Sequence, residues 1–250
     1  MRPPEQLVHS RTRMRQRYAV FPLEGYPLSR LPSWRDAEVR ILASPALGAA
    51  FVQYLIDLPA GASGQFAADG STETFHFVVS GTGRFDTTAE PLSCGSFGLI
   101  PPTIAARYSA DRGQALRLLV LRKRYERVQG IEPFVPLVGH ESRVAMEPWA
   151  DSSHCRLQTL LPDDFAFDMA MNIFTFDPGF GLPIVETHVM EHGLWFLQGK
   201  GLYYLDGDWM EVEKDDFIWM GPFCPQSFYA TGPTPARYIY YKNVNRDIII

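Results

Sequence analysis

Two stretches of the chain share one pattern, Glu73-Thr-Phe-His-Phe-Val-Val-Ser-Gly-Thr-Gly83 and Glu191-His-Gly-Leu-Trp-Phe-Leu-Gln-Gly-Lys-Gly201. Each begins with a glutamate, continues through a run rich in apolar and aromatic residues, and ends in two glycines separated by one residue. Gly61 recurs as Gly179 at the same separation of 118 positions. Because a pattern repeated at one separation indicates an internal duplication, the sequence predicts two copies of one domain of about 120 residues.

The segments between glycines and prolines are short and rich in residues that favour strands. They are 4 to 9 residues long, as in Thr74–Val79 and Ala50–Leu58, and the chain has 20 Gly and 20 Pro to separate them. Many short strands of this kind are typical of sandwiches and barrels. Asp206-Gly207 predicts a hairpin turn, since these residues adopt the positive φ angles that such turns need. We therefore expect an all-β protein without a long amphipathic helix.

The duplication predicts two domains and a connection between them. Residues 1–126 are expected to form an N-terminal barrel with an N-terminal arm, 127–149 a linker, and 150–250 a C-terminal barrel. The linker is placed where Pro133, Pro136 and Pro148 occur without strand-like alternation. The arginines near the start of the chain predict that the arm is solvated; they are Arg11, Arg13, Arg15 and Arg17.

Composition excludes several classes of protein. With 46% hydrophobic residues the chain can form a core, and no apolar run approaches the roughly 20 residues that span a bilayer. A formal net charge of −5 argues against a nucleic-acid partner. Cys94, Cys155 and Cys224 are too few and too widely spaced for a disulfide framework. The start of the chain, 1–7, has no apolar run of a secretory signal, so we expect a cytoplasmic protein with no membrane partner.

Glu186, His188 and His192 form the strongest candidate metal site. On a strand, Glu186 and His188 would point to one face, and His192 would share that face if the strand continued. One carboxylate and two imidazoles suit Mn, Fe, Ni or Zn. The alternative is a pair of core histidines beside a solvated glutamate.

The spacing Glu186-x-His188-x3-His192-x6-Gly199 resembles the first cupin motif, His-x-His-x3-4-Glu-x6-Gly. Here a Glu stands at the first His and a His at the usual Glu. This resemblance implies a bicupin fold, with two tandem double-stranded β-helix (jelly-roll-like) barrels.

Asp216-Phe-Ile-Trp-Met-Gly-Pro-Phe-Cys-Pro-Gln226 resembles the second cupin motif, with Gln226 near the position of the fourth ligand. A Gln carbonyl is a neutral ligand, weaker than imidazole, and it favours a hard divalent ion.

The first copy lacks these ligands. At the separation of 118, the equivalents of Glu186, His188 and His192 are Ala68, Gly70 and Thr74, while Gln226 falls opposite Ala105 or Ala106. His76 is out of register with the C-terminal histidines. We therefore expect a metal-free N-terminal copy and one metal per chain.

Nearly the whole chain, including the stretch Leu42–Ala49, resembles the (S)-ureidoglycine aminohydrolase family of bicupins. The similarity is carried by the Glu-x-His-x3-His box, the Gly199–Trp209 run, the Pro-Gln at 225–226 and the closing stretch Arg237–Arg246. The family implies Mn²⁺, or another divalent first-row metal, bound by Glu186, His188, His192 and Gln226. It implies substrate contacts from Tyr203, Tyr238 and Lys242, catalytic roles for Glu186 and Lys242, and hydrolysis of a small ureide, (S)-ureidoglycine, to (S)-ureidoglycolate and ammonia.

Other interpretations remain open at this point. The same barrel serves cupin dioxygenases and isomerases, and a bicupin can also be a non-enzymatic storage or ligand-sensing protein. Tyr203 is also compatible with ordinary strand packing, and Lys242 with a solvated edge charge. We expect a homo-oligomer, because a copy without ligands is retained and aromatic-rich strands leave apolar faces to cover.

Overall fold

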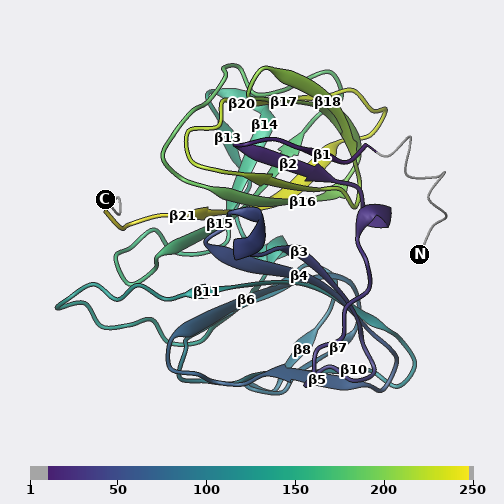
Figure 1. Cartoon of the computed structure of the whole chain (residues 1–250), viewed down its shortest axis with the longest axis vertical. Coiled ribbons are helices and arrows are strands. Elements are labelled where there is room, and N and C mark those ends of the chain that lie inside the picture. The colour runs from purple at the N-terminus through teal and green to yellow at the C-terminus, as the bar shows by residue number, and fades with distance from the viewer. Residues whose placement is uncertain (1–10, 248–250) are drawn as a thin grey trace. The chain divides into compact units, whose positions relative to one another are not determined.

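The computed structural model describes residues 11–247, and the stretch 1–7 considered above for a secretory signal lies outside them. The chain divides into two compact units (Figure 1). Pro27–Arg143 is here called the N-terminal unit, and the chain up to Tyr26 together with Val144 onward the C-terminal unit. Helix in the described residues is limited to the 3-10 turns Leu23–Gly25, Pro45–Leu47 and Glu141–Arg143. None of the described helices is long or apolar enough to cross a membrane.

The N-terminal unit consists of two antiparallel sheets. Its strands are β3 (Glu38–Ala43), β4 (Phe51–Leu58), β5 (Ser63–Phe66), β6 (Thr72–Gly81), β7 (Gly83–Phe85), β8 (Glu90–Leu92), β9 (Ser96–Ile100), β10 (Ala106–Ala110), β11 (Leu116–Arg124) and β12 (Leu137–His140). The larger sheet has the order β12-β9-β6-β11-β4-β3 and the smaller one β5-β10-β7-β8.

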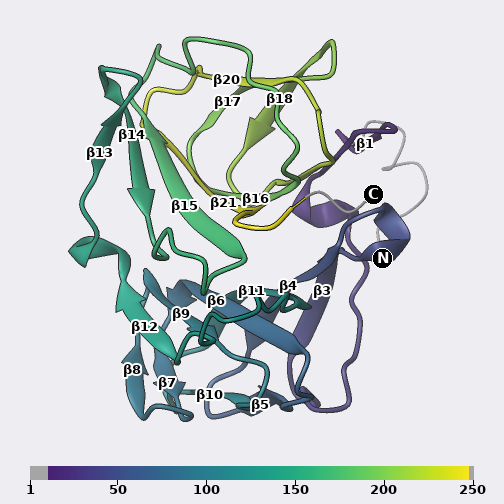
Figure 2. The ribbon, with the colours of Figure 1, turned by 90° about the vertical axis from the view of Figure 1, so that its left-hand side faces the viewer.

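The C-terminal unit also has two sheets, and these carry the candidate site. Its strands are β1 (Arg13–Met14), β2 (Tyr18–Phe21), β13 (Glu147–Trp149), β14 (Ser152–Thr159), β15 (Met169–Phe176), β16 (His192–Gln198), β17 (Lys200–Leu205), β18 (Asp208–Glu213), β19 (Phe217–Met220), β20 (Gln226–Ala230) and β21 (Ala236–Asn243). The eight-stranded sheet has the order β1-β2-β19-β16-β21-β15-β14-β13, and β18-β17-β20 form the other (Figure 2).

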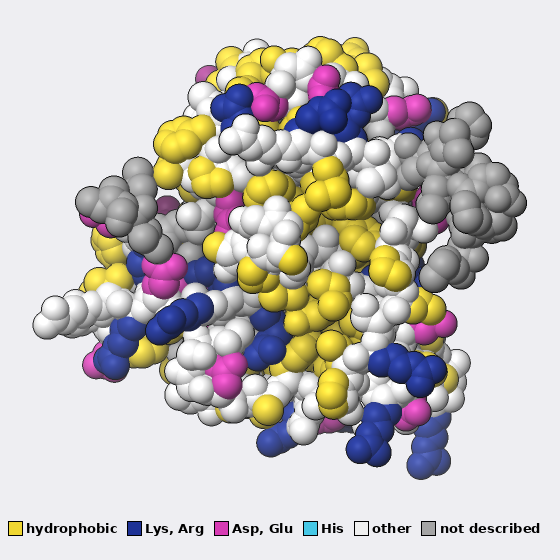
Figure 3. Space-filling model, in the orientation of Figure 1, with side chains coloured by type: hydrophobic (Ala, Val, Ile, Leu, Met, Phe, Trp, Pro, Cys, Tyr) yellow, Lys and Arg dark blue, Asp and Glu magenta, His cyan; other side chains and the backbone are white. Residues whose placement is uncertain are grey.

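The N-terminal strands belong to the C-terminal unit, which corrects the predicted boundary of the first domain. Strand β2 pairs with β19, with Tyr18 opposite Met220, so β1 and β2 are the first two strands of the eight-stranded sheet. The arginines of this arm are partly exposed, but each has a carboxylate partner. Arg11 pairs with Asp216 and Glu213, Arg13 and Arg15 with Asp208, and Arg17 with Asp206. Figure 3 shows acidic and basic side chains interspersed over the visible face of this unit.

The predicted linker 127–149 is also more ordered than expected. Strand β12 pairs with β9 and thereby completes a sheet of the N-terminal unit. Strand β13 pairs with β14 and starts the C-terminal unit. Pro133 and Pro136 precede β12, and Pro148 lies within β13, an edge strand in which a missing N–H donor is tolerated.

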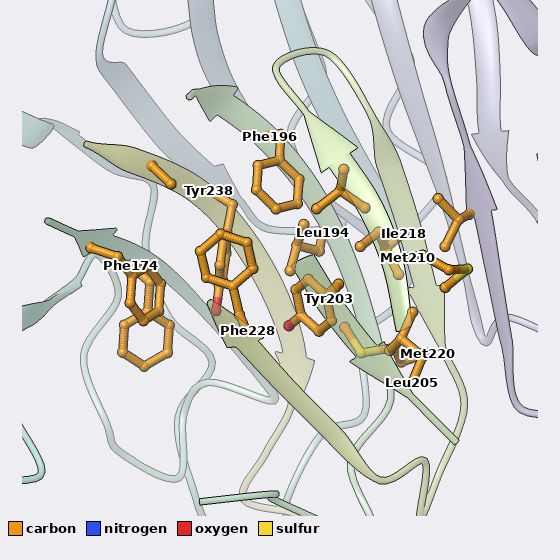
Figure 4. Close-up of a cluster of buried hydrophobic side chains, with 14 of the residues drawn as sticks. Phe174, Leu194, Phe196, Tyr203, Leu205, Met210, Ile218, Met220, Phe228 and Tyr238 are labelled. Carbon is orange, nitrogen blue, oxygen red and sulfur yellow. The ribbon is translucent and has the colours of Figure 1, made fainter. Parts of the chain in front are cut away.

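The core of the C-terminal unit lies between its two sheets. Leu194 and Phe196 of β16 pack in one buried cluster with Tyr203 and Leu205 of β17 (Figure 4). These residues alternate along each strand, so period-2 patterning directs them inward. The predicted hairpin is confirmed, because Leu205 pairs with Asp208 across Asp206 and Gly207, whose φ angles are 49° and 97°.

The two units repeat the same strand pairings, as expected of a duplication. Thr74 lies opposite Ile100 and Arg122, and His192 lies opposite Met220 and Lys242. The fold is therefore all-β with two similar units, as predicted. The hydrogen-bonded sheets of the described residues remain open, so they do not form closed barrels.

Candidate metal-binding and active site

A cavity of about 100 Å³ opens in the C-terminal unit. It is lined by Trp149, Phe174, Leu182, Glu186, His188, His192, Leu194, Tyr203, Met220, Gln226, Tyr238, Tyr240 and Lys242. All seven residues singled out from the sequence for a site are in this lining. They come from β16, β17, β20, β21 and the segment before β16, so positions up to 56 residues apart in sequence, Glu186 and Lys242, meet here.

Glu186 and His188 do not lie on a strand, contrary to the expectation from their spacing. They belong to an irregular segment, and strand β16 begins only at His192. Glu186 is fixed through its backbone, because its N–H donates to the Gln226 carbonyl at 2.8 Å and its carbonyl accepts from the Gln226 N–H at 2.9 Å. The His188 carbonyl accepts from the Phe223 N–H at 2.8 Å. Backbone hydrogen bonds to the second motif therefore hold this segment without a regular strand.

Three side chains converge at the polar end of the cavity. His192 Nε2 lies 3.2 Å from His188 Nε2, and Gln226 Nε2 lies 3.1 Å and 3.3 Å from these two ring nitrogens. His192 Nδ1–H donates to the Tyr241 carbonyl at 2.9 Å, which leaves the lone pair on Nε2, facing the cluster. Burial lowers the pKa of His192 to about 3 and also lowers the pKa of His188, so both imidazoles are neutral near pH 7.

Glu186 and Lys242 add opposite charges to the same cavity. Burial raises the pKa of the Glu186 carboxyl, and the positive charge of Lys242 partly opposes that rise. Within residues 11–247, no group of three or more His, Cys, Asp and Glu side chains is arranged to hold a metal ion. The converging cluster thus consists of two imidazoles and an amide, while the Glu186 carboxylate lines the same cavity.

Tyr203 and Tyr238 form the wall beside Gln226. The Tyr203 hydroxyl donates to Gln226 Oε1 at 3.2 Å. The two tyrosine rings lie 6.0 Å apart, and their hydroxyls point to the same side of the buried cluster (Figure 4). Burial raises the pKa of both phenols well above the usual value, so both hydroxyls stay protonated.

The sequence reasoning missed Tyr240, Asn172 and Trp149. Tyr240 lines the cavity between Tyr238 and Lys242 on β21, and its hydroxyl accepts from Asn172 Nδ2 at 3.2 Å. Alternation along the strand was a usable signal, since residues 238, 240 and 242 share one face. Trp149, assigned to the linker, gave no such signal, because its place depends on its ring packing against Phe174.

The strand register revises one equivalence drawn from the sequence. Ala106 lies opposite Phe66, just as Gln226 lies opposite Glu186, so Phe66 rather than Ala68 is the counterpart of Glu186. Ser63 and Gly181 mark the same place in the two copies, since they lie opposite Ser109 and Tyr229. Four residues, 182–185, separate Gly181 from Glu186, and only two separate Ser63 from Phe66. These two extra residues shift the alignment, which a constant separation of 118 does not allow for.

Structural comparison first defines the class of protein. An oxalate decarboxylase from Lactobacillus farciminis matches 91% of this chain, and 86% of its own, with a TM-score of 0.69 and 10% sequence identity. At this identity the likeness concerns the fold alone, which is an all-β, cupin-like fold. No family model matches the sequence.

Closer relatives then define the family. The (S)-ureidoglycine aminohydrolase of Escherichia coli K12 is 33% identical over 238 residues, covering 93% of this chain and 90% of that protein. The (S)-ureidoglycine aminohydrolase of Arabidopsis thaliana is 32% identical, covering 92% and 76%. A structure of a glyoxylate-induced protein from Pseudomonas aeruginosa has a TM-score of 0.87 at 33% identity, covering 97% and 94%. The chain belongs to the (S)-ureidoglycine aminohydrolase family, which confirms the resemblance found in the sequence.

Proposed function

We propose that this protein hydrolyses (S)-ureidoglycine to (S)-ureidoglycolate and ammonia, a step in the breakdown of purine-derived ureides. Family membership carries the proposal. The convergence of His188, His192 and Gln226 in a cavity that also contains Glu186 and Lys242 supports it. In this reaction the bond between the α-carbon and the amine nitrogen breaks, and a bond from the α-carbon to a water oxygen forms. The amine leaves as ammonia.

We propose that Glu186, His188, His192 and Gln226 hold one divalent metal ion, Mn²⁺ in the first instance. Ligand atoms about 2.1 Å from an ion are about 3.0 Å apart in an octahedron and about 3.4 Å apart in a tetrahedron. The separations of 3.1 to 3.3 Å between the three side-chain nitrogens fall between these values. Rotation of the Gln226 amide would exchange Nε2 for Oε1, the atom able to ligate. Once bound, the metal would polarise the substrate as a Lewis acid.

The remaining groups are proposed to bind and orient the substrate. Lys242 would pair with the substrate carboxylate, since an ammonium in a partly closed cavity favours a small anion. Tyr203 and Tyr238 would offer neutral hydrogen bonds to the ureido group. Glu186 and Lys242 are the two charged groups available to move protons during departure of the amine.

Family membership also supports a more detailed proposal for the fold and the assembly. Each unit would be a double-stranded β-helix, making the chain a bicupin, and the N-terminal unit would hold no metal. We also propose a cytoplasmic homo-oligomer. Light scattering at micromolar protein concentration tests the assembly, and a monomer would contradict it.

An ammonia-release assay on freshly generated ureidoglycine, combined with elemental analysis of the purified protein, tests the proposed function. Substrate labelled with ¹⁵N in the amine alone should give labelled ammonia, and the S enantiomer should be consumed selectively. Unlabelled ammonia, or equal turnover of both enantiomers, would contradict the proposal. Turnover that requires O₂ would instead favour a cupin dioxygenase.

A further inference from the structure

Tyr240 has a place in the cavity that the family resemblance did not assign. On β21 it alternates with Tyr238 and Lys242, and all three line the cavity. Its ring lies parallel to that of Phe174, with centroids 5.5 Å apart and an interplanar angle of 8°. The ring also meets the His192 imidazole edge-on at 5.5 Å. These contacts restrain the ring, so its hydroxyl occupies a defined position.

Asn172 fixes the role of that hydroxyl. It lies on β15 directly opposite Tyr240, is 3% exposed and does not line the cavity. Its Nδ2 donates to the Tyr240 oxygen at 3.2 Å. An amide nitrogen can only donate, so the tyrosine oxygen accepts in this bond and keeps its own proton for another partner.

The Tyr240 hydroxyl has a proton that its bond to Asn172 does not use, and Tyr240 lines the cavity. A phenolic proton lies close to the ring plane on one of two sides. Among residues 11–247 no acceptor for this proton is found, although Tyr240 lines a cavity that contains other polar groups. Tyr240 is half-buried, and a polar group at a cavity wall that has no acceptor in the protein is commonly retained where a ligand supplies the partner.

We infer that Tyr240 is a substrate-binding residue that donates a hydrogen bond to the ureido carbonyl oxygen, and that Asn172 is its positioning residue. This inference rests on the proposed function, because it takes a small anionic ureide as the ligand. The Cα atoms of residues two apart on a strand are about 6.7 Å apart, so Lys242 and Tyr240 can bind groups at opposite ends of such a molecule. The Lys242 ammonium takes the carboxylate, and the neutral Tyr240 donor takes the neutral carbonyl.

The first test compares the Tyr240→Phe variant with the wild type. The substitution removes only the oxygen and keeps the ring on Phe174, so the fold and the metal content should be unchanged. We expect the KM for ureidoglycine to rise about tenfold with a smaller change in kcat, the size expected when a buried acceptor loses a neutral donor. Tyr204→Phe is the matched control, because Tyr204 packs on Trp209 and does not line the cavity.

A binding measurement separates the ureido contact from turnover. N-carbamoylglycine has the carboxylate and the ureido group but no α-amine, and glycine lacks the ureido group. Calorimetric titration should show that N-carbamoylglycine binds Tyr240→Phe about tenfold more weakly than it binds the wild type. The binding of glycine, measured in the same way, should be equal in the two proteins. Equal weakening for both probes would overturn the assignment of the carbonyl.

The role of Asn172 is tested by a double-mutant cycle. Asn172→Leu should raise the KM in the wild-type background but cause no further rise in the Tyr240→Phe background, since the group it positions is already absent. Additive effects would overturn the positioning role. If the wild type releases ammonia and Tyr240→Phe has wild-type KM and binding, only the Tyr240 assignment fails. If the wild type releases none, the proposed function fails, and this inference with it.

Discussion

The two units repeat one set of strand pairings but have different kinds of side chain at the equivalent positions. In the C-terminal unit, His192, Gln226 and Lys242 face a cavity. Their counterparts by register in the N-terminal unit are Thr74, Ala106 and Arg122. The strand framework is thus the same, and the side chains at these positions differ: imidazole, amide and ammonium groups around a cavity in one unit, and threonine, alanine and arginine in the other.

Arg122 places a half-buried cation at the position in the N-terminal unit that Lys242 has in the C-terminal unit. Its guanidinium lies 4.6 Å from the centroid of the Phe66 ring, its Nε donates to Thr74 Oγ1 at 3.2 Å, and its Nη2 lies 3.6 Å from Asp69. Phe66 stands at the place of Glu186, so an aromatic ring and a guanidinium replace a carboxylate and an ammonium. A charge that has its partners within the protein needs no ligand, whereas the C-terminal set leaves lone pairs that a ligand can use.

The segment before β6 is a regular strand, whereas the equivalent segment before β16 is irregular. In the N-terminal unit, Ser63–Phe66 is a regular strand paired with β10. In the C-terminal unit, the equivalent stretch makes only the isolated bridges of Gly181 and Glu186. Two extra residues release this stretch from regular pairing. The candidate site therefore includes the stretch where the C-terminal unit lacks regular strand pairing, and there side chains need not alternate between two faces.

The largest expected effect comes from His192→Ala. Loss of this imidazole should abolish metal binding and lower ammonia release to less than about one thousandth of the wild-type rate, because the Lewis acid would be lost. Elemental analysis and the ammonia assay measure both. Thr74→Ala, the equivalent change in the N-terminal unit, should alter neither. Unchanged metal content in His192→Ala, or wholesale unfolding, would contradict the comparison.

Lys242→Ala should have the next largest effect. Without the ammonium, the KM for ureidoglycine should rise by about 10- to 100-fold, the usual range for losing a charged hydrogen-bond partner, and Lys242→Arg should restore part of it. Steady-state kinetics distinguish the two variants. Lys200→Ala, an exposed strand position, is the control. An unchanged KM in Lys242→Ala would place this lysine outside substrate binding.

Arg122→Leu, in contrast to the two variants above, should lower the stability of the protein and leave its activity unchanged. It removes the contact over Phe66 and the hydrogen bond to Thr74, so unfolding free energy should fall by about 1–3 kcal/mol. Urea unfolding measures the change, and Arg107→Leu at an exposed position of β10 provides the baseline. A loss of ammonia release without a loss of stability would show that Arg122 takes part in the reaction. It would contradict the view that the reaction depends on the C-terminal unit alone.

The smallest effect is expected from Asp69→Asn, and it should depend on pH. Partial burial alone would raise the pKa of Asp69, but hydrogen bonds from Thr72 and Ser71 lower it to about 2. Since this pKa is below the usual unfolded value of about 3.9, the carboxylate contributes stability above about pH 4 that is lost as the pH falls towards 2. Urea unfolding across this range should show Asp69→Asn less stable than wild type at pH 7 and nearly equal at the acid end. A pH-independent difference would refute this account.

Features that depend on local pattern could be predicted from the amino-acid sequence. The repeated glycines and apolar runs revealed the duplication, and Asp206-Gly207 specified a hairpin because its backbone preferences are a property of two adjacent residues. The motif spacing identified Glu186, His188, His192 and Gln226, which the structure brings to one cavity. Alternation along β21 also contained the signal for Tyr240, although the resemblance drew attention only to Tyr238 and Lys242.

Tertiary structure decided whatever depends on pairing between distant segments. Strand β2 pairs with β19 about 200 positions away, and nothing near Tyr18 in the sequence marks Met220 as its neighbour. Glu186 is held by hydrogen bonds to the Gln226 backbone rather than by a strand of its own, so period-2 reasoning failed there. Asn172 acquires its role from lying opposite Tyr240 across two strands. Local propensity depends on neighbouring residues, whereas register between remote strands depends on the fold as a whole, because burial and backbone hydrogen bonding are satisfied only when all strands are in place.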